Sequence, residues 1–247
     1  MKRPFTKPCR FYRLQHSQRK GGVSFQVRHK ETDLWIRAER NLEREALTCV
    51  LQCRHQLEEY IARHPEFLKS LAPIPEDPLA PPLVRRMIEA SRRVDVGPMA
   101  GVAGAIAEAV ALALKPHSSI LVVENGGDCY LDPAEKATIG VFAGPHSPFT
   151  GRFGLCFEAD RFPLGICTSS ATVGHSLSFG RADAVTVVSK DAVLADCAAT
   201  ALGNRVKSTA DLERVLEDAA KIPRVEGVLI LMGDRMAMWG NIEIVPL

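Results

Sequence analysis

Residues 101–128 read GVAGAIAEAVALALKPHSSILVVENGGD, and the order of features in this stretch returns later in the chain. A helix of small residues at 101–114 precedes an apolar strand at 120–124 and a turn that ends in Gly127-Asp128. Residues 194–234 repeat this order, with a small-residue helix, an apolar strand at 227–232 and a Gly233-Asp234 turn. One further helix, at 211–221, is inserted in the second copy. The repeated order predicts two similar lobes that pack together.

Hydrophobic periodicity in the rest of the chain predicts an α+β protein. Val23, Phe25 and Val27 alternate with polar residues, which is typical of a half-buried strand. The helix expected at 42–63 ends near Pro65, because proline disfavours helical backbone in the residue before it. A second helix is expected at 83–90. Further strands are expected at 10–14, which a turn at 20–22 connects to 23–27, and at 34–36, 140–143, 154–157, 165–168, 184–189 and 242–245.

Composition excludes several classes of protein. The chain has 247 residues, of which 46% are hydrophobic, and a formal charge of +2, which excludes a disordered chain and a strongly basic nucleic-acid binder. No uninterrupted apolar stretch approaches the roughly 20 residues that span a bilayer. Seven scattered cysteines indicate reduced thiols. We therefore expect a cytoplasmic protein with no membrane or nucleic-acid partner.

We expect a single domain over residues 1–247. Within it, residues 1–72 supply strands and a helix, the proline-rich segment 73–82 is a stiff connector, and 83–247 form the main ligand-binding part. The first 30 residues carry nine Lys or Arg and no acid. This basic segment is either a solvated face or a clamp for a phosphate-bearing ligand or an acidic partner surface.

Two cysteines, Cys49 and Cys53, lie four residues apart on the helix expected at 42–63, with His55 close by. Three such groups cannot complete a tetrahedral metal shell, and the chain has no CxxC motif to supply the rest. The pattern favours packing over metal binding.

Three polar clusters carry candidate chemistry. In the first, Glu124, Asn125, Gly126, Gly127 and Asp128 end an apolar strand. Paired glycines let backbone N–H groups approach a phosphate closely, and Asp128 or Asn125 suits a ribose or a ring edge. A tight turn without a ligand selects the same residues, so both interpretations stay open.

The second cluster is the hydroxyl-rich stretch from Cys167 to Ser176, which includes Thr168, Ser169 and Ser170. His175 within it has an imidazole suited to general-base work near neutral pH. A Ser-His-Asp hydrolase using Asp183 is the less favoured alternative, because the chain has no G-x-S-x-G nucleophile elbow.

The third cluster is Ala195-Asp196-Cys197-Ala198-Ala199-Thr200. Residues four apart share a helix face, so the Asp196 carboxylate and the Thr200 hydroxyl point the same way. Two oxygen ligands, completed by water and phosphate, are a common way to hold Mg²⁺. An acid in the first turn of a helix is also stabilised by the helix dipole alone.

Together these stretches resemble the ApbE-like superfamily of FAD-dependent flavin transferases, and most closely its uncharacterised bacterial and archaeal branch. The segments GPMAGVAGAIAE, VVENGGD, CTSSATVGHSLSFGRADAVTVVS, LADCAATALGN and GVLILMGDRMAMWG carry the resemblance, from about residue 95 onward. It implies a T-fold-like α+β architecture of two similar, intertwined lobes.

The resemblance also implies site roles. In the flavin transferases, an Asp and a Thr four residues later hold Mg²⁺ beside the FAD pyrophosphate, and Asp196 and Thr200 occupy those positions. Glu124, Asn125, the Gly126-Gly127-Asp128 turn and the Thr168-Ser169-Ser170 loop would bind the flavin nucleotide. His175 would help to deprotonate an acceptor hydroxyl, which attacks phosphorus while AMP leaves.

The chain departs from the transferases at two places. Ser176-Leu177-Ser178-Phe179 replaces their I-I-D-P-type segment, and no lysine stands near 102–104. We therefore expect a Mg²⁺-dependent protein that binds FAD and transfers FMN or cleaves the pyrophosphate. The alternatives are a nucleotide or metabolite binder without chemistry, or a pterin or purine in the same cleft. The acceptor protein and homo-oligomerisation are left open.

Overall fold

The computed structural model describes residues 22–173 and 178–247. The α-helices in this part of the chain are α2 (Glu43–Arg63), α3 (Pro65–Lys69), α4 (Pro82–Val94), α5 (Val102–Leu114), α6 (Ala192–Arg205) and α7 (Leu212–Ala220). The strands are β1 (Val23–His29), β2 (Thr32–Ala38), β3 (Leu121–Asn125), β4 (Asp128–Asp132), β5 (Ala137–Gly140), β6 (Phe153–Phe157), β7 (Leu164–Ser169), β8 (Ala184–Ser189), β9 (Val225–Met232), β10 (Arg235–Gly240) and β11 (Glu243–Pro246).

Eight strands form one antiparallel sheet in the order β1-β2-β3-β4-β7-β8-β9-β10. Its two halves have the same plan, in which a pair of strands is followed by helices and then by a second pair of strands. In the first half α5 leads into β3 and β4, and in the second α6 and α7 lead into β9 and β10. The repeated order predicted from the sequence is therefore present. Pairing of β4 with β7, for example Leu131 with Leu164, joins the halves into one sheet.

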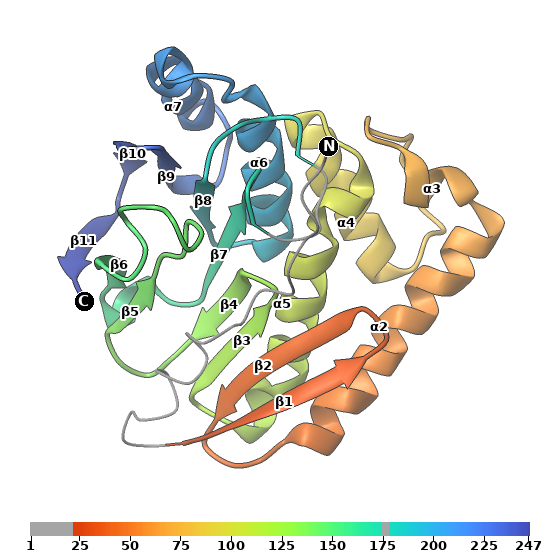
Figure 1. The fold of residues 1–247 in the computed structure, drawn as a ribbon. Helices are drawn as coiled ribbons and strands as arrows, with labels where there is room; N and C mark the ends of the chain where they lie inside the picture. The colour runs from red at the N-terminus through yellow and green to blue at the C-terminus, as the bar shows by residue number, and fades with distance from the viewer. Residues whose placement is uncertain (1–21, 174–177) are drawn as a thin grey trace.

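The helices cover one face of this sheet (Figure 1). Because side chains alternate along a strand, every second residue points to the helices, among them Val123, Tyr130 and Val187. These residues belong to one buried cluster with α2, α4, α5 and α6. Burial of this shared apolar surface is the main term that holds the two halves together.

A second sheet, in the order β11-β6-β5, packs on the opposite face over the second half. Leu155 of β6 lies in one buried cluster with Ile166 and Leu229 of the large sheet. This arrangement explains the nearly continuous apolar sequences of β8 and β9, which are buried on both faces.

Most predicted elements occur where expected, and the differences have physical causes. The strand predicted at 140–143 lies at Ala137–Gly140, where it pairs with β6. β1 forms its hairpin with β2 through Lys30 and Glu31, and the strand and turn predicted at 10–14 and 20–21 lie outside the described residues. The helix predicted at 83–90 extends to Val94, where Asp95 ends it in a left-handed conformation.

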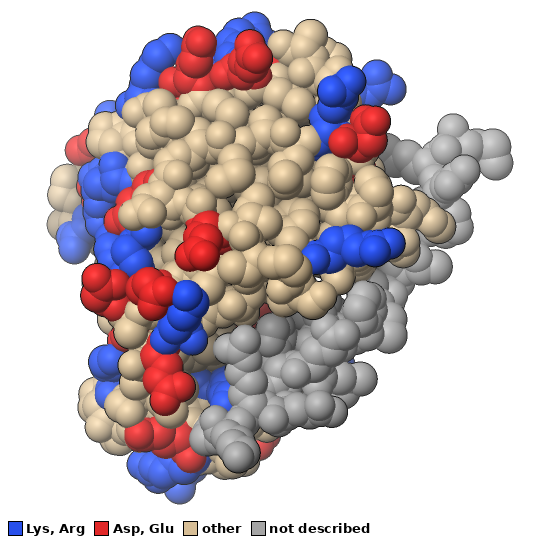
Figure 2. Space-filling model, turned by 90° about the vertical axis from the view of Figure 1, so that its left-hand side faces the viewer, with Lys and Arg blue, Asp and Glu red and all other residues tan. Residues whose placement is uncertain are grey.

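Short 3₁₀ turns extend α5 at both ends, at Pro98–Gly101 and Lys115–His117, so the helical segment begins and ends where the sequence predicted, near Pro98 and Pro116. The segment Pro98–His117 is long and apolar enough to cross a membrane by length and composition alone. In this fold α5 packs against α2, α6 and β3 as a core helix. Figure 2 shows charges of both signs around the margin of a largely uncharged face, without a continuous basic patch on its described part.

Candidate functional site

The candidate site lies where the β3–β4 turn, the end of β7, the first turn of α5 and the second turn of α6 meet. The alternative that Asp196 is an acid in the first turn of its own helix is wrong, because α6 begins at Ala192 and its first turn has no acid. Each half of the sheet contributes: Asp128 begins β4 in the first half, and Asp196 lies in α6 of the second. Residues from all three predicted clusters therefore come together here, with Thr168 and Ser169 at the end of β7, although 68 positions separate the two acids in the chain.

Asp196 caps a helix other than its own. Its Oδ2 accepts the N–H of Gly104 at 2.9 Å, at the start of α5, which has no capping side chain of its own. The Glu108 carboxylate of α5 in turn accepts the N–H of Ala192 at 2.9 Å, at the start of α6. The two helices thus supply each other with an acid at their positive ends.

Gly104 makes this arrangement sterically feasible. A Cβ at this position would lie 2.3 Å from the carbonyl oxygen of Ala192 and 3.0 Å from the Cβ of Asp196. Only a residue without a side chain lets the two helix starts approach so closely. Sequence reasoning missed this role of Gly104, although the small-residue composition of 101–105 was its signal.

The Asp128 side chain lies on the face of the large sheet that the helices cover, as does Asp196 of α6. Its Oδ1 accepts the N–H of Thr168 at 3.2 Å, and the Cys167 thiol is a second hydrogen-bond partner. Burial raises the pKa of Asp128 to about 7 against the pull of these hydrogen bonds, and the charge of Glu124 adds to the rise. A half-buried carboxylate that is desolvated by its neighbours and lies near another acid is costly to ionise.

Asp196 is also costly to ionise. Burial raises the pKa of Asp196 well above its usual range, and the charge of Asp128 raises it further, while the N–H groups of Gly104 and Ala103 act in the opposite direction. The structure therefore brings together two desolvated acids that repel each other when both are charged. The sequence placed Asp128 in the nucleotide cluster and gave no sign that it faces Asp196.

Thr200 and Ser169 continue the row of polar side chains that begins with Asp128 and Asp196. Thr200 follows Asp196 by one turn of α6 and is half-buried. Gly203 follows on the same helix face, where a Cβ would lie 3.5 Å from the Ser169 hydroxyl oxygen. This row connects the carboxylate pair to the end of β7.

The remaining nucleotide-cluster residues differ in orientation. Asn125 turns toward α5 and donates from Nδ2 to the carbonyl of Ala103 at 3.1 Å. Gly126 and Gly127 have φ values of 75° and 125°, which the tight turn requires. Strand alternation points the buried Glu124 to the sheet face opposite Asn125, so it does not join the acid pair directly.

The hydroxyl loop has mixed roles in the structure. Thr168 shares a 2.8 Å hydrogen bond with Thr186 across the strands, which makes its side chain part of the sheet. The Ser170 hydroxyl oxygen accepts the N–H groups of Thr172 and Val173, at 3.1 and 2.9 Å, and shapes the loop. His175 lies outside the described residues, which exclude 174–177.

The donor set fits magnesium better than zinc. Asp128, Asp196 and Thr200 offer hard oxygen atoms, and a divalent cation would offset the cost of ionising the buried Asp196 and the half-buried Asp128. The described residues contain no group of three or more His, Cys, Asp or Glu that could hold a metal ion. A closed four-ligand zinc site is thus absent from this part of the chain, whereas Mg²⁺ commonly takes one or two carboxylates and completes its shell with water and phosphate.

Comparison with known proteins identifies the family. A family model described as AbpE bacteria matches residues 14–225. A UPF0280 protein of Methanocella arvoryzae is 41% identical over 224 residues, covering 89% of each chain. A UPF0280 protein of Methanocaldococcus jannaschii is 39% identical over 219 residues, covering 86% of this chain and 88% of the relative.

Solved structures show the fold at lower identity. The flavin transferase ApbE of Vibrio cholerae superposes with a TM-score of 0.53 at 14% identity, covering 89% of this chain and 97% of the other. The ApbE protein of Thermotoga maritima gives a TM-score of 0.54 at 14% identity, covering 90% and 96%. The chain therefore belongs to the AbpE bacteria family, together with the UPF0280 proteins, and shares the fold of the ApbE flavin transferases.

Proposed function

We propose that this protein binds the flavin dinucleotide FAD together with Mg²⁺ and transfers FMN or cleaves the FAD pyrophosphate. The convergence of the Asp128 and Asp196 carboxylates from the two halves of the sheet carries the proposal. The two halves would be the T-fold-like lobes that the family resemblance implies, with the ligand between them. The fold shared with the flavin transferases supports the nucleotide class.

Different residues of the chain would bind the cation, orient the nucleotide and accept a proton. Asp196 and Thr200, together with Asp128, would hold the cation, which when bound neutralises charge on the pyrophosphate. Ser169 and the backbone of the Gly126-Gly127 turn would orient the nucleotide by hydrogen bonds. His175 would take the proton of an acceptor hydroxyl as that oxygen bonds to phosphorus and AMP departs.

The test combines binding and chemistry. The purified chain is titrated with FAD in Mg²⁺ and in EDTA, binding is followed by flavin fluorescence, and released AMP is measured by chromatography. We expect Mg²⁺-dependent binding that Asp196→Asn weakens at least about tenfold, since the carboxylate charge is lost while the side-chain shape is kept.

Asp234→Asn is the matched control, because Asp234 lies in the β9–β10 turn as Asp128 does in the β3–β4 turn, yet its side chain is 88% exposed. It should bind FAD as the parent does. AMP release would establish phosphoryl chemistry, and binding without AMP would support the alternative of a nucleotide-binding protein. An affinity for FAD that is the same with Mg²⁺ and with EDTA, and the same in Asp196→Asn as in the parent, would contradict the cation site.

A further inference from the structure

Two thiols lie together in α2, away from the acid pair. The Sγ atoms of Cys49 and Cys53 are 4.0 Å apart, and the Cys49 thiol also contacts the carbonyl oxygen of Ala109 in α5 at 3.6 Å. Cys53 is buried, whereas Cys49 is half-buried. The thiol pair therefore lies at the interface of two core helices with one sulfur near the surface.

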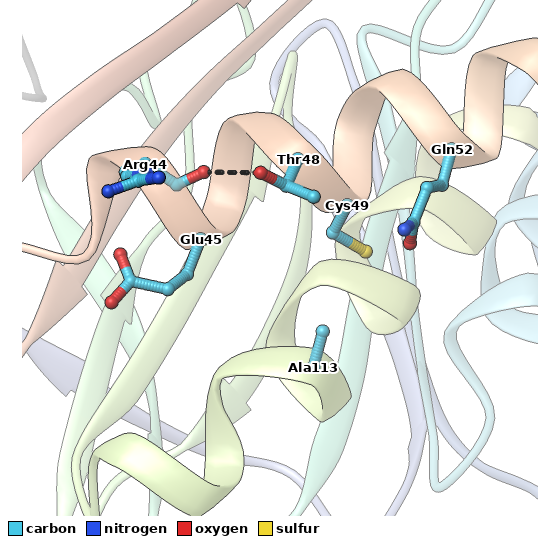
Figure 3. Close-up of a pocket in the computed structure, with 6 residues that line it drawn as sticks. All are labelled: Arg44, Glu45, Thr48, Cys49, Gln52 and Ala113. Atoms are coloured by element: carbon cyan, nitrogen blue, oxygen red, sulfur yellow. Dashed lines mark hydrogen bonds between the residues drawn. The ribbon is translucent and has the colours of Figure 1, made fainter.

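A cavity of about 440 Å³ opens beside Cys49. Figure 3 shows the Cys49 side chain pointing from α2 into the space toward α5. The lining residues are Arg44, Glu45, Thr48, Cys49, Gln52 and Ala113. A small molecule could thus reach one sulfur of the pair.

We propose that Cys49 and Cys53 form a two-thiolate site for a soft, thiophilic metal ion of the Cu(I) class, with a third position open to a small thiol that enters from the cavity. This site is independent of the proposed flavin site. A metal–sulfur bond is about 2.3 Å, so sulfurs 4.0 Å apart subtend about 120° at a shared ion. That angle suits a trigonal site, and soft thiolates select Cu(I) among the first-row metals.

Helix geometry disfavours a disulfide at the same place. Residues four apart on a helix have Cβ atoms about 5–6 Å apart, whereas a disulfide needs about 3.5–4.5 Å. Closing the bond would distort α2 in the middle of its buried face. A metal bridge, which holds the sulfurs about 4 Å apart, leaves the helix intact.

Gln56 gives an independent indication of a missing partner. It follows Cys53 by three positions and Cys49 by seven, so the three side chains share one helix face. Its buried Oε1 atom has no hydrogen-bond partner in the described part of the chain. A cation or a polar ligand group on this helix face would give the acceptor a partner.

The first test measures retention of Cu(I) by the reduced full-length chain under anaerobic conditions against a chromophoric Cu(I) chelator. We expect the parent to hold one more ion per chain than Cys49→Ser or Cys53→Ala, with at least tenfold tighter retention. Cys129→Ser, a change at another half-buried cysteine, is the matched control and should behave as the parent. Equal retention by Cys49→Ser would overturn the proposal.

The second test uses the unaltered protein, so it does not depend on a variant folding. Trypsin releases both cysteines in one peptide, residues 45–54. One equivalent of Cu(I) should protect this peptide from alkylation by iodoacetamide, as read by mass spectrometry. Unchanged alkylation, or recovery of the peptide with a Cys49–Cys53 disulfide, would contradict a metal site.

Discussion

At the scale of single residues, Asp128 and Asp196 decide what this site can do. Each acid is desolvated, and the charge of Asp128 raises the cost of ionising Asp196. Their helix-capping and turn hydrogen bonds explain why the acids tolerate this position, but hydrogen bonds alone leave their pKa values high. A bound divalent cation is the partner that would make two charges stable here.

This reasoning predicts an unusual dependence of stability on pH. The pKa of Asp128 is raised to about 7 in the folded chain from 3.8, so the folded state holds a proton that the unfolded state has released. The stabilisation is therefore complete below about pH 4 and is lost as the pH rises through about 7, at no more than about 1.4 kcal/mol per pH unit. In EDTA the melting temperature should fall between pH 5 and pH 7.5, by several degrees.

Two comparisons isolate the cause. Asp128→Asn should remove the part of this fall that Asp128 contributes, while Asp196, whose pKa burial also raises, keeps the rest. Asp234→Asn should keep the whole fall. Mg²⁺ should raise the melting temperature more at pH 7.5 than at pH 5, since it competes with protons for the same oxygens. A pH profile that Asp128→Asn leaves unchanged would show that this acid does not titrate as described.

Sequence reasoning reached part of this site. The four-residue spacing correctly predicted that Asp196 and Thr200 occupy neighbouring turns of one helix. The partnership of Asp196 with Asp128 and Gly104 had no local signal, because it arises from packing between segments distant in the chain. The metal and nucleotide roles of these residues stay predictions.

At the scale of elements, the contact between α5 and α6 positions the acid pair. Gly104→Ala should lower the free energy of unfolding by about 1–3 kcal/mol, because its Cβ would overlap the Ala192 carbonyl, only 2.3 Å away. The displaced α6 should also weaken any Mg²⁺-dependent stabilisation. Chemical denaturation with and without Mg²⁺ measures both effects.

Gly203→Ala is the control within α6. Its new Cβ would meet Ser169 at an ordinary 3.5 Å, so the substitution should be neutral or stabilise the helix by up to about 1 kcal/mol. Equal effects of the two changes would contradict a specific close approach at Gly104.

The strands that sequence reasoning missed share one physical property. β4 and β10 follow tight glycine turns, and each forms by pairing with the strand just before it. β10 has the sequence RMAMWG, in which exposed methionines alternate with the half-buried Ala237 and Trp239, so neither β-branched residues nor an apolar–polar alternation marks it as a strand. Long apolar strands such as β8 and β9 were predicted because their burial on both faces leaves a strong sequence signal.

At the scale of the whole molecule, the eight-stranded sheet and the core on its helix side lead us to expect a single folding unit. The main buried cluster runs from Val27 to Ile230 and crosses the proline-rich segment 73–82. We therefore predict one cooperative calorimetric transition, with equal calorimetric and van't Hoff enthalpies.

A fragment of residues 83–247 should fail to fold, because it lacks β2 and the buried face of α2, which packs on α5. Circular dichroism and amide exchange of the fragment test this expectation. A fragment with a native-like melting transition would show that the segment 73–82 separates two domains.

The central claim is that the two halves of the sheet meet to hold a cation and a dinucleotide. The most direct measurement is a crystal structure of the full chain with FAD and Mn²⁺, which replaces Mg²⁺ and is located by its anomalous scattering. We predict an ion about 2 Å from a carboxylate oxygen of Asp196, close to Asp128 and Thr200 and in contact with the FAD pyrophosphate. An ordered FAD bound elsewhere, or an anomalous map with no peak at the acid pair, would contradict the account.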